Sequence, residues 1–159
     1  MSDGRGQSGR GSPVCLVSAC LLGRACRYDG KSKGHEGVRA EVDRLRAEGW
    51  QIEAVCPEQH LGTPRPAVTL TGGDGHAVWS GEARAVEVAD GVDRTEAFRA
   101  GAERCDRPEA ERALLKARSP SCGVGTTHID GVAVAGDGVF AARLRARGVR
   151  LLTEADLPE

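Results

Sequence analysis

Short apolar segments alternate with amphipathic ones in the first third of the chain. Residues 13–19 (PVCLVSA) are apolar and rich in branched side chains, as expected for a buried strand. Residues 38–48 repeat apolar side chains at helical spacing, and Gly49 follows as a plausible helix C-cap. Residues 51–55 (QIEAV) then predict a second strand. This order of strand, helix and strand is typical of a parallel βαβ unit.

The same alternation continues through the rest of the chain. Residues 93–105 and 139–147 predict helices, and residues 149–153 predict a last short strand. Residues 113–118 (ALLKAR) predict a further strand, although this composition also suits the end of a helix. Residues 67–89 alternate apolar and polar side chains around a glycine-rich turn, which indicates a hairpin-like insertion. We therefore expect a single α/β domain with a mostly parallel, Rossmann-like sheet, helices on both faces and a small hairpin insertion.

Composition narrows the class of protein further. Residues 1–12 are rich in glycine and charged side chains and predict a disordered leader, so that the folded domain spans residues 13–159. No stretch reaches the roughly 18 apolar residues of a membrane span, and the amino terminus lacks the apolar segment of a secretory signal. A net charge of −1, with two Phe, two Trp and one Tyr, argues against a nucleic-acid-binding surface. We expect a cytoplasmic protein whose six cysteines stay reduced.

Three cysteines lie at the carboxyl ends of predicted strands. Cys20 and Cys56 come just after the first two strands, and Cys122 follows the segment 113–118. In open α/β sheets the ligand crevice lies outside the carboxyl ends of the strands. We therefore expect the three thiols to converge at one edge of the sheet, provided that 113–118 is a strand. Such a group is a candidate metal site.

The other cysteines and the spacing of all six do not decide which metal the site would bind. Cys15 inside the first strand and Cys105 near a helix end are expected to be small buried apolar side chains, and Cys26 is interpreted as structural. The chain has no C-x-x-C pair, which disfavours a zinc ribbon or a thioredoxin-type motif, and it lacks the clustered spacing of ferredoxins. From spacing alone, zinc, iron–sulfur and loop cysteines without a function remain alternatives.

Polar side chains near these cysteines suggest acid/base chemistry. Glu58 lies two residues after Cys56 and is suited to proton transfer, with a solvated loop glutamate as the alternative. Ser119 and Ser121 flank a proline before Cys122, where their hydroxyls would donate to a cluster sulfide or to a substrate. Their alternative role is to cap a turn or a helix.

The loops also carry candidate substrate-binding residues. Arg27, Tyr28 and Asp29 form a compact polar turn, and Arg65 lies between two prolines. These side chains suit a polar heterocycle, while Arg27 and Asp29 alternatively brace the loop as an ion pair. The four histidines show no i, i+4 arrangement and are interpreted as surface or loop residues.

Several motifs in their order along the chain resemble the 2-thiouracil desulfurase family, once catalogued as a domain of unknown function. They span nearly the whole chain after the leader and are VSACLLGRACRYDGKSK (17–33), VCPEQHLGTPRP (55–66), LLKARSPSCG (114–123) and, more weakly, DRTEAFRAGAE (93–103) and GDGVFAARLRARGVRL (136–151). One departure lies before Asp130-Gly131, where the family often carries an aromatic residue and this chain has Ile129.

The resemblance implies a 4Fe–4S cluster held by Cys20, Cys56 and Cys122, with the fourth iron open to the sulfur of a substrate. Iron is thiophilic, so an open iron favours a sulfur leaving group. The implied reaction replaces the sulfur of 2-thiouracil by the oxygen of water, giving uracil and hydrogen sulfide without net redox change. Glu58 would be the acid/base, assisted by Ser119 or Ser121. The expected partner is a small thiolated nucleobase.

Two other readings stay open. The first is a non-enzymatic module that binds a metal or a cluster for structure or sensing. The second is a cluster that passes sulfur to another molecule, tRNA included, although the near-neutral charge disfavours tight RNA binding. No feature of the sequence indicates an oligomeric state.

Overall fold

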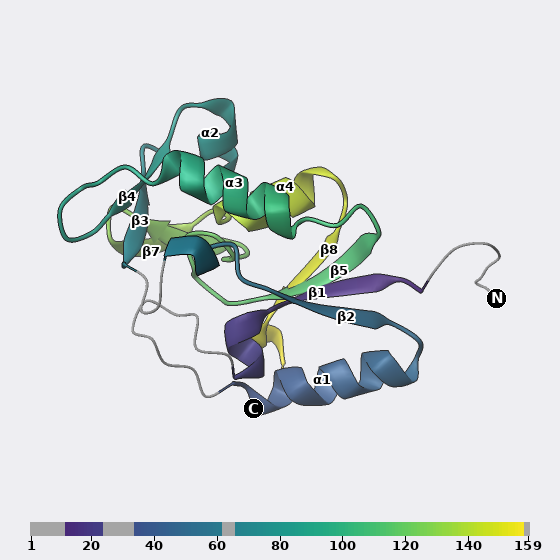
Figure 1. The fold of residues 1–159 in the computed structure, drawn as a ribbon. Helices are drawn as coiled ribbons and strands as arrows, with labels where there is room; N and C mark the ends of the chain where they lie inside the picture. Colours follow the sequence, from purple (N-terminus) through teal and green to yellow (C-terminus); the bar gives the residue numbers. More distant parts are fainter. Residues whose placement is uncertain (1–11, 24–33, 62–65, 158–159) are drawn as a thin grey trace.

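A four-stranded parallel sheet forms the centre of the molecule (Figure 1). The computed structural model describes residues 12–23, 34–61 and 66–157. The strands of this sheet are, in spatial order, β2 (Gln51–Val55), β1 (Val14–Ser18), β5 (Ala110–Leu115) and β8 (Arg150–Thr153). All three pairings are parallel, so the carboxyl ends of the four strands lie at one edge.

Helices cover both faces of this sheet (Figure 1). The helices are α1 (Glu36–Ala47) on one face, and α3 (Thr95–Cys105) and α4 (Val139–Ala146) on the other. Strand β1 shows why both faces are apolar, since successive side chains of a strand point to opposite sides. Val14 and Leu16 join the core under α3 and α4, while Cys15 and Val17 pack against α1.

A second sheet of four strands lies beside the first. Its strands are, in spatial order, β4 (Arg84–Glu87), β3 (Val68–Thr71), β6 (Thr126–Ile129) and β7 (Val132–Ala135). Strand β3 pairs antiparallel with β4 and parallel with β6, and β6 pairs antiparallel with β7. The short helix α2 (Gly75–Ser80) connects β3 to β4. This mixed sheet packs into the same core as α3 and α4 through residues such as Leu70 and Ala85.

The predicted α/β fold with a parallel sheet and helices on both faces is confirmed, and the insertion is larger than expected. The strand predicted at 113–118 is present as β5, but it begins earlier, at Ala110, and ends at Leu115. The expected hairpin at 67–89 is an antiparallel pair interrupted by α2 rather than a tight turn. The β6–β7 hairpin was not predicted, although Asp130 (φ 52°) and Gly131 (φ 79°) form the positive-φ pair that a two-residue hairpin turn requires.

Helix α4 begins directly on the turn that carries Cys122. The backbone N–H of Val139 donates to the carbonyl of Pro120 (2.9 Å), and that of Phe140 to the carbonyl of Ser121 (2.8 Å). The first N–H groups of a helix have no partner within the helix, so these carbonyls replace a side-chain cap. The turn and the helix therefore hold each other in place.

Asp137 joins this junction to α2. Its carboxylate accepts hydrogen bonds from the Arg145 guanidinium (2.7 and 3.1 Å), the Gly125 backbone N–H (2.8 Å) and His76 (2.8 Å). Its backbone carbonyl accepts from the Gly75 N–H at 2.7 Å. Burial opposes ionisation of this carboxyl group, but the hydrogen bonds from Arg145, Gly125 and His76 outweigh burial and lower its pKa to about 2.

None of the helices in the described part of the chain has the length and apolarity to span a membrane. Of the predicted leader, residues 1–12, only Ser12 is among the described residues.

We expect Gly138→Ala to lower the free energy of unfolding by about 2 kcal/mol or more. A Cβ at this position would lie 2.5 Å from the carbonyl carbon and 2.6 Å from the carbonyl oxygen of Ser121, so backbone must move. Denaturant unfolding checks this, with Gly81→Ala as the control, because Gly81 has positive φ but open space around its Cβ and should cost only about 1 kcal/mol. Equal losses in the two variants would contradict the steric account.

We expect Asp137→Asn to lower the free energy of unfolding at pH 7 by about 2 kcal/mol. A depressed folded-state pKa stabilises the protein above the unfolded-state pKa, near about 4, and this stabilisation is lost as the pH falls toward 2. The difference between wild type and variant should therefore be constant from pH 7 to 5 and shrink by pH 3 in denaturant unfolding. Asp43→Asn, an exposed position on α1, is the control and should change little.

Candidate active site

Cys20, Cys56 and Cys122 follow three neighbouring parallel strands. Cys20 lies in the 3-10 helix η1 (Ala19–Leu22) after β1, and Cys56 directly follows β2. Cys122 lies seven residues beyond the end of β5, in the turn that docks on α4. Because β1 pairs with both β2 and β5, the three chain segments leave the sheet at the same edge. The three cysteines therefore follow strands that end at the same edge of the sheet, as the predicted thiol site requires.

Cys122 is the deepest of the three. It is 4 % exposed, and burial raises the pKa of its thiol to about 12, while hydrogen bonds from the Ser18 and Ser121 hydroxyls act in the opposite direction. Cys56 is half-buried and lies close enough to Cys122 to interact with it electrostatically. No disulfide bond involves the cysteines among the described residues. Those residues contain no group of three His, Cys, Asp or Glu side chains arranged to hold a metal ion, so the three-cysteine ligand set stays a prediction.

Glu58 and the two serines form a hydrogen-bonded chain of which Glu58 and Ser121 are buried. The Ser121 hydroxyl donates to Oε2 of Glu58 at 2.6 Å, and the oxygens of Ser119 and Ser121 lie 3.1 Å apart. Glu58 is 3 % exposed and Ser121 is 2 % exposed. The structure thus joins the three predicted acid/base residues, which lie on two segments far apart in the sequence, in one contiguous group.

The backbone fixes the direction of this chain. The Ser119 oxygen accepts hydrogen bonds from the backbone N–H groups of Ser121 and Cys122, both at 3.1 Å. A hydroxyl has two acceptor lone pairs and one hydrogen, so Ser119 has its hydrogen left to donate. Ser121 gives its own hydrogen to the Glu58 carboxylate. The hydroxyls therefore point from Ser119 through Ser121 to Glu58.

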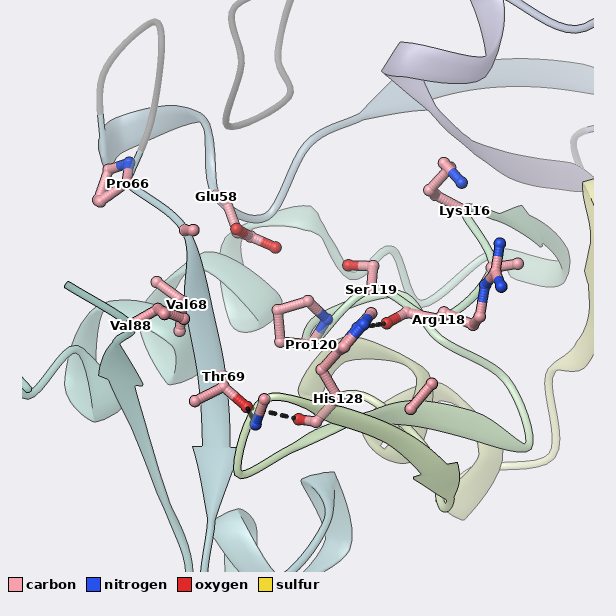
Figure 2. A pocket seen from close by; sticks show the side chains of 14 residues that line it. Glu58, Pro66, Val68, Thr69, Val88, Lys116, Arg118, Ser119, Pro120 and His128 are labelled. Carbon is pink, nitrogen blue, oxygen red and sulfur yellow. Dashed lines mark hydrogen bonds between the residues drawn. The ribbon is translucent and has the colours of Figure 1, made fainter.

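A cavity of about 510 Å³ opens on this chain (Figure 2). Its walls include Glu58 and Ser119, which face the cavity from two different segments, together with Lys116, Arg118 and His128. No cysteine is among the described residues that line it. Glu58 and Ser121 thus lie between the cavity and Cys122, since Ser121 contacts both Glu58 and the Cys122 sulfur (3.7 Å).

Neighbouring segments hold residues 116–119, the part of the cavity wall that follows β5. Glu154, in the 3-10 helix η3 (Glu154–Asp156), binds the Lys116 ammonium group at 2.8 Å and accepts the Ala117 backbone N–H at 2.8 Å. The Thr127 hydroxyl on β6 donates to the Ser119 carbonyl at 2.9 Å. Both sheets therefore contribute to the position of Ser119.

Some predicted site residues lie outside the described residues. These are Arg27, Tyr28, Asp29 and Arg65, the predicted substrate contacts, together with Cys26. Cys15 is fully buried in β1 and Cys105 is 8 % exposed at the end of α3, as expected for apolar cysteines. However, the Cys105 thiol interacts with the backbone of Cys56, a proximity that the sequence did not indicate.

Two further residues of the site were missed from the sequence. Ser18, the last residue of β1, bonds the Cys122 sulfur and also accepts the Lys116 backbone N–H at 2.9 Å. His128 lies on β6 in the cavity wall rather than in a loop. The Asp130-Gly131 turn was the available signal, because it places His128 within the strand before a hairpin turn.

Comparison with known proteins finds a relative and a solved structure that are similar to most of this chain. The chain is 37% identical over 153 residues to the uncharacterized protein YbbK of Bacillus subtilis (strain 168), covering 91% of this chain and 97% of YbbK. A solved structure of the 4Fe–4S-dependent thiouracil desulfidase TudS is similar, with a TM-score of 0.70, 38% identity and 94% of each chain covered. The 2-thiouracil desulfurase family profile matches residues 15–156. The chain belongs to the 2-thiouracil desulfurase family.

Proposed function

We propose that this protein is a 4Fe–4S-dependent desulfurase that converts thiolated pyrimidines such as 2-thiouracil, with water, into uracil and hydrogen sulfide. The observation that carries the proposal is the Glu58–Ser121–Ser119 chain, which lies between an open cavity and the Cys122 thiol. Membership of the 2-thiouracil desulfurase family and the likeness to TudS point to the same reaction.

The donor set fits an iron–sulfur cluster. Cys20, Cys56 and Cys122 would hold it, because none of them forms a disulfide and they follow three adjacent strands at one edge of the sheet. Thiolates are the usual ligands of iron–sulfur clusters, and the Ser18 hydroxyl supplies a hydrogen bond of the kind that ligand sulfurs commonly receive. When bound, a cluster with three protein ligands supplies an open, thiophilic iron for the substrate sulfur.

Glu58 is placed to accept and return a proton. It lines the cavity with its carboxylate and is held by the Ser121 hydroxyl at 2.6 Å, which fixes its orientation. A water molecule attacking carbon 2 of the pyrimidine must lose protons, and the departing sulfur must gain them. One carboxylate at this position serves both transfers, as base and then as acid. Because the exchange of sulfur for oxygen leaves carbon 2 and the sulfur in the same oxidation states, the reaction needs no reductant or oxidant.

The two serines take different parts. Ser119 lines the cavity, and a bound substrate competes with the Ser121 oxygen for its one hydroxyl hydrogen, so Ser119 is the serine that donates to a substrate. Ser121 is buried behind it and positions Glu58.

The cavity suits a small heterocycle. Its volume of about 510 Å³ accommodates a pyrimidine with room for water, and its walls mix apolar and polar groups, as small-molecule sites usually do. Arg27, Tyr28, Asp29 and Arg65 remain the predicted further contacts to the substrate. Thiolate ligands persist in a reducing compartment, so we place the enzyme in the cytoplasm, acting on free bases rather than on nucleic acid.

We expect Cys122→Ala to abolish binding of the cluster. Anaerobic reconstitution should give the wild type four iron and four sulfide per chain, and the variant close to none, because one of three thiolates is lost. Iron and acid-labile sulfide analysis measures this. Cys15→Ala is the matched control, since Cys15 packs against α1 away from the site and should keep its iron.

Full iron content in Cys122→Ala would contradict the ligand set. About one zinc and no iron in the anaerobically purified wild type would instead favour a zinc-binding module without desulfurase activity.

We expect Glu58→Gln to lower kcat for 2-thiouracil by about 100-fold or more while the iron content is unchanged. Glutamine keeps the size of the side chain and its hydrogen bond to Ser121 but cannot take up a proton. Uracil formation by the reconstituted protein measures the effect, with the exposed Glu109→Gln as control. Normal turnover in Glu58→Gln would remove Glu58 from the acid/base role.

A further inference from the structure

His128 presents one defined nitrogen to the Glu58 cavity. Its Nδ1 lies 2.7 Å from the backbone carbonyl oxygen of Arg118. A carbonyl oxygen only accepts hydrogen bonds, so Nδ1 carries the proton and donates it. In the neutral ring the other nitrogen, Nε2, is then an acceptor.

Nothing in the described part of the chain hydrogen-bonds Nε2 of His128, and the ring lies in the cavity wall. Figure 2 shows the imidazole extending from β6 toward Arg118 and Ser119, on the opposite side of the cavity from Val68 and Val88. The exposure of the residue is intermediate, so the ring is supported on one side and open on the other. An oriented acceptor in a cavity wall is a contact available to a ligand.

The backbone beneath His128 is held as firmly as the ring. The Thr69 hydroxyl lies 3.2 Å from the His128 carbonyl, and the same hydroxyl accepts the Gly131 N–H at 2.9 Å. Thr69 is 7 % exposed on β3, the neighbour of β6 in the second sheet. The position of the ring is therefore set before any ligand arrives.

Arg118, which holds the ring, has an unusual backbone. Its φ of 64° lies in the left-handed region, which residues other than glycine rarely adopt. It forms an isolated parallel bridge to Thr127, the residue before His128. Such backbone strain persists only where the surrounding structure imposes it, and it tends to occur at ligand sites. Here the strained residue, Arg118, is the one whose carbonyl oxygen accepts the hydrogen bond from Nδ1 of His128.

We propose that His128 is a substrate-binding residue whose Nε2 accepts a hydrogen bond from a ring N–H of the thiolated pyrimidine. This inference rests on the proposed function. In 2-thiouracil each ring N–H lies beside the thiocarbonyl group, and one of them also lies beside the carbonyl group. The cavity offers the complementary acceptor for such an N–H at Nε2 of His128. His128 thereby selects pyrimidines that are not alkylated at that nitrogen.

Two substitutions separate the two nitrogens of the ring. In His128→Asn the side-chain amide reaches the position of Nδ1, so the bond to the Arg118 carbonyl is kept while Nε2 is lost. In His128→Gln the amide reaches the position of Nε2. We expect KM for 2-thiouracil to rise about tenfold in His128→Asn with the iron content unchanged, and to recover in part in His128→Gln. His76→Asn, the same change at an exposed histidine on α2, is the control and should leave KM unchanged.

Methylated substrates test the partner of Nε2. Of 1-methyl- and 3-methyl-2-thiouracil, the one that blocks the contacting N–H should lose about tenfold in kcat/KM with the wild type and much less with His128→Asn. The product uracil carries the same N–H groups, so calorimetry provides a readout without turnover. Its Kd should rise about tenfold in His128→Asn.

The outcomes distinguish this inference from the proposed function. If the reconstituted wild type does not convert 2-thiouracil, the proposed function fails. If the wild type is active but His128→Asn keeps its KM and its Kd for uracil, the role of His128 is overturned. Equal penalties for both methylated substrates in wild type and His128→Asn would overturn it as well.

Discussion

The site depends on the hydrogen bonds between the amino end of α4 and the carbonyls of the turn before it. Val139 and Phe140 donate to Pro120 and Ser121, so a helix end that would otherwise need a side-chain cap is satisfied by the turn itself. The turn is in return held in one conformation, because its carbonyls are hydrogen-bonded to a helix that is buried in the core. The position of Cys122 is therefore set by the hydrogen bonds between this turn and α4, which is not part of the sheet.

Glycine makes this contact possible at two places. Gly138 lies against the carbonyl group of Ser121, and a Cβ at Gly123 would come within 2.3 Å of the Thr126 carbonyl oxygen. These close approaches bring α4, the turn and β6 together with little space for side chains. The hydroxyls of Ser119 and Ser121 then lie where the backbone N–H groups and Glu58 can bind them. The polar chain is a consequence of the backbone packing.

The sequence predicted the parallel sheet well, because its strands and helices carry simple apolar patterns. Residues 51–55 form β2 as predicted, and the cysteines after β1 and β2 are placed as expected. The second sheet was harder, since β7 has four exposed residues and the pairing of β6 with β3 joins residues far apart in the sequence. His128 was missed for this reason: its role depends on the strand around it, on the Arg118 backbone and on Thr69, which no local pattern brings together. The contact between Ser121 and Glu58 joins residues on separate segments and was likewise beyond the sequence.

The burial of Glu58 also bears on where protons go during a turnover. The carboxylate is 3 % exposed and is a wall of the cavity, so a ligand that fills the cavity separates it from bulk water. In the proposed reaction, a proton that Glu58 takes from the attacking water then has no solvent to exchange with until the product leaves. The proposed acid and base are in that case the same carboxylate, which takes up a proton early in the cycle and returns it late without exchange with bulk water.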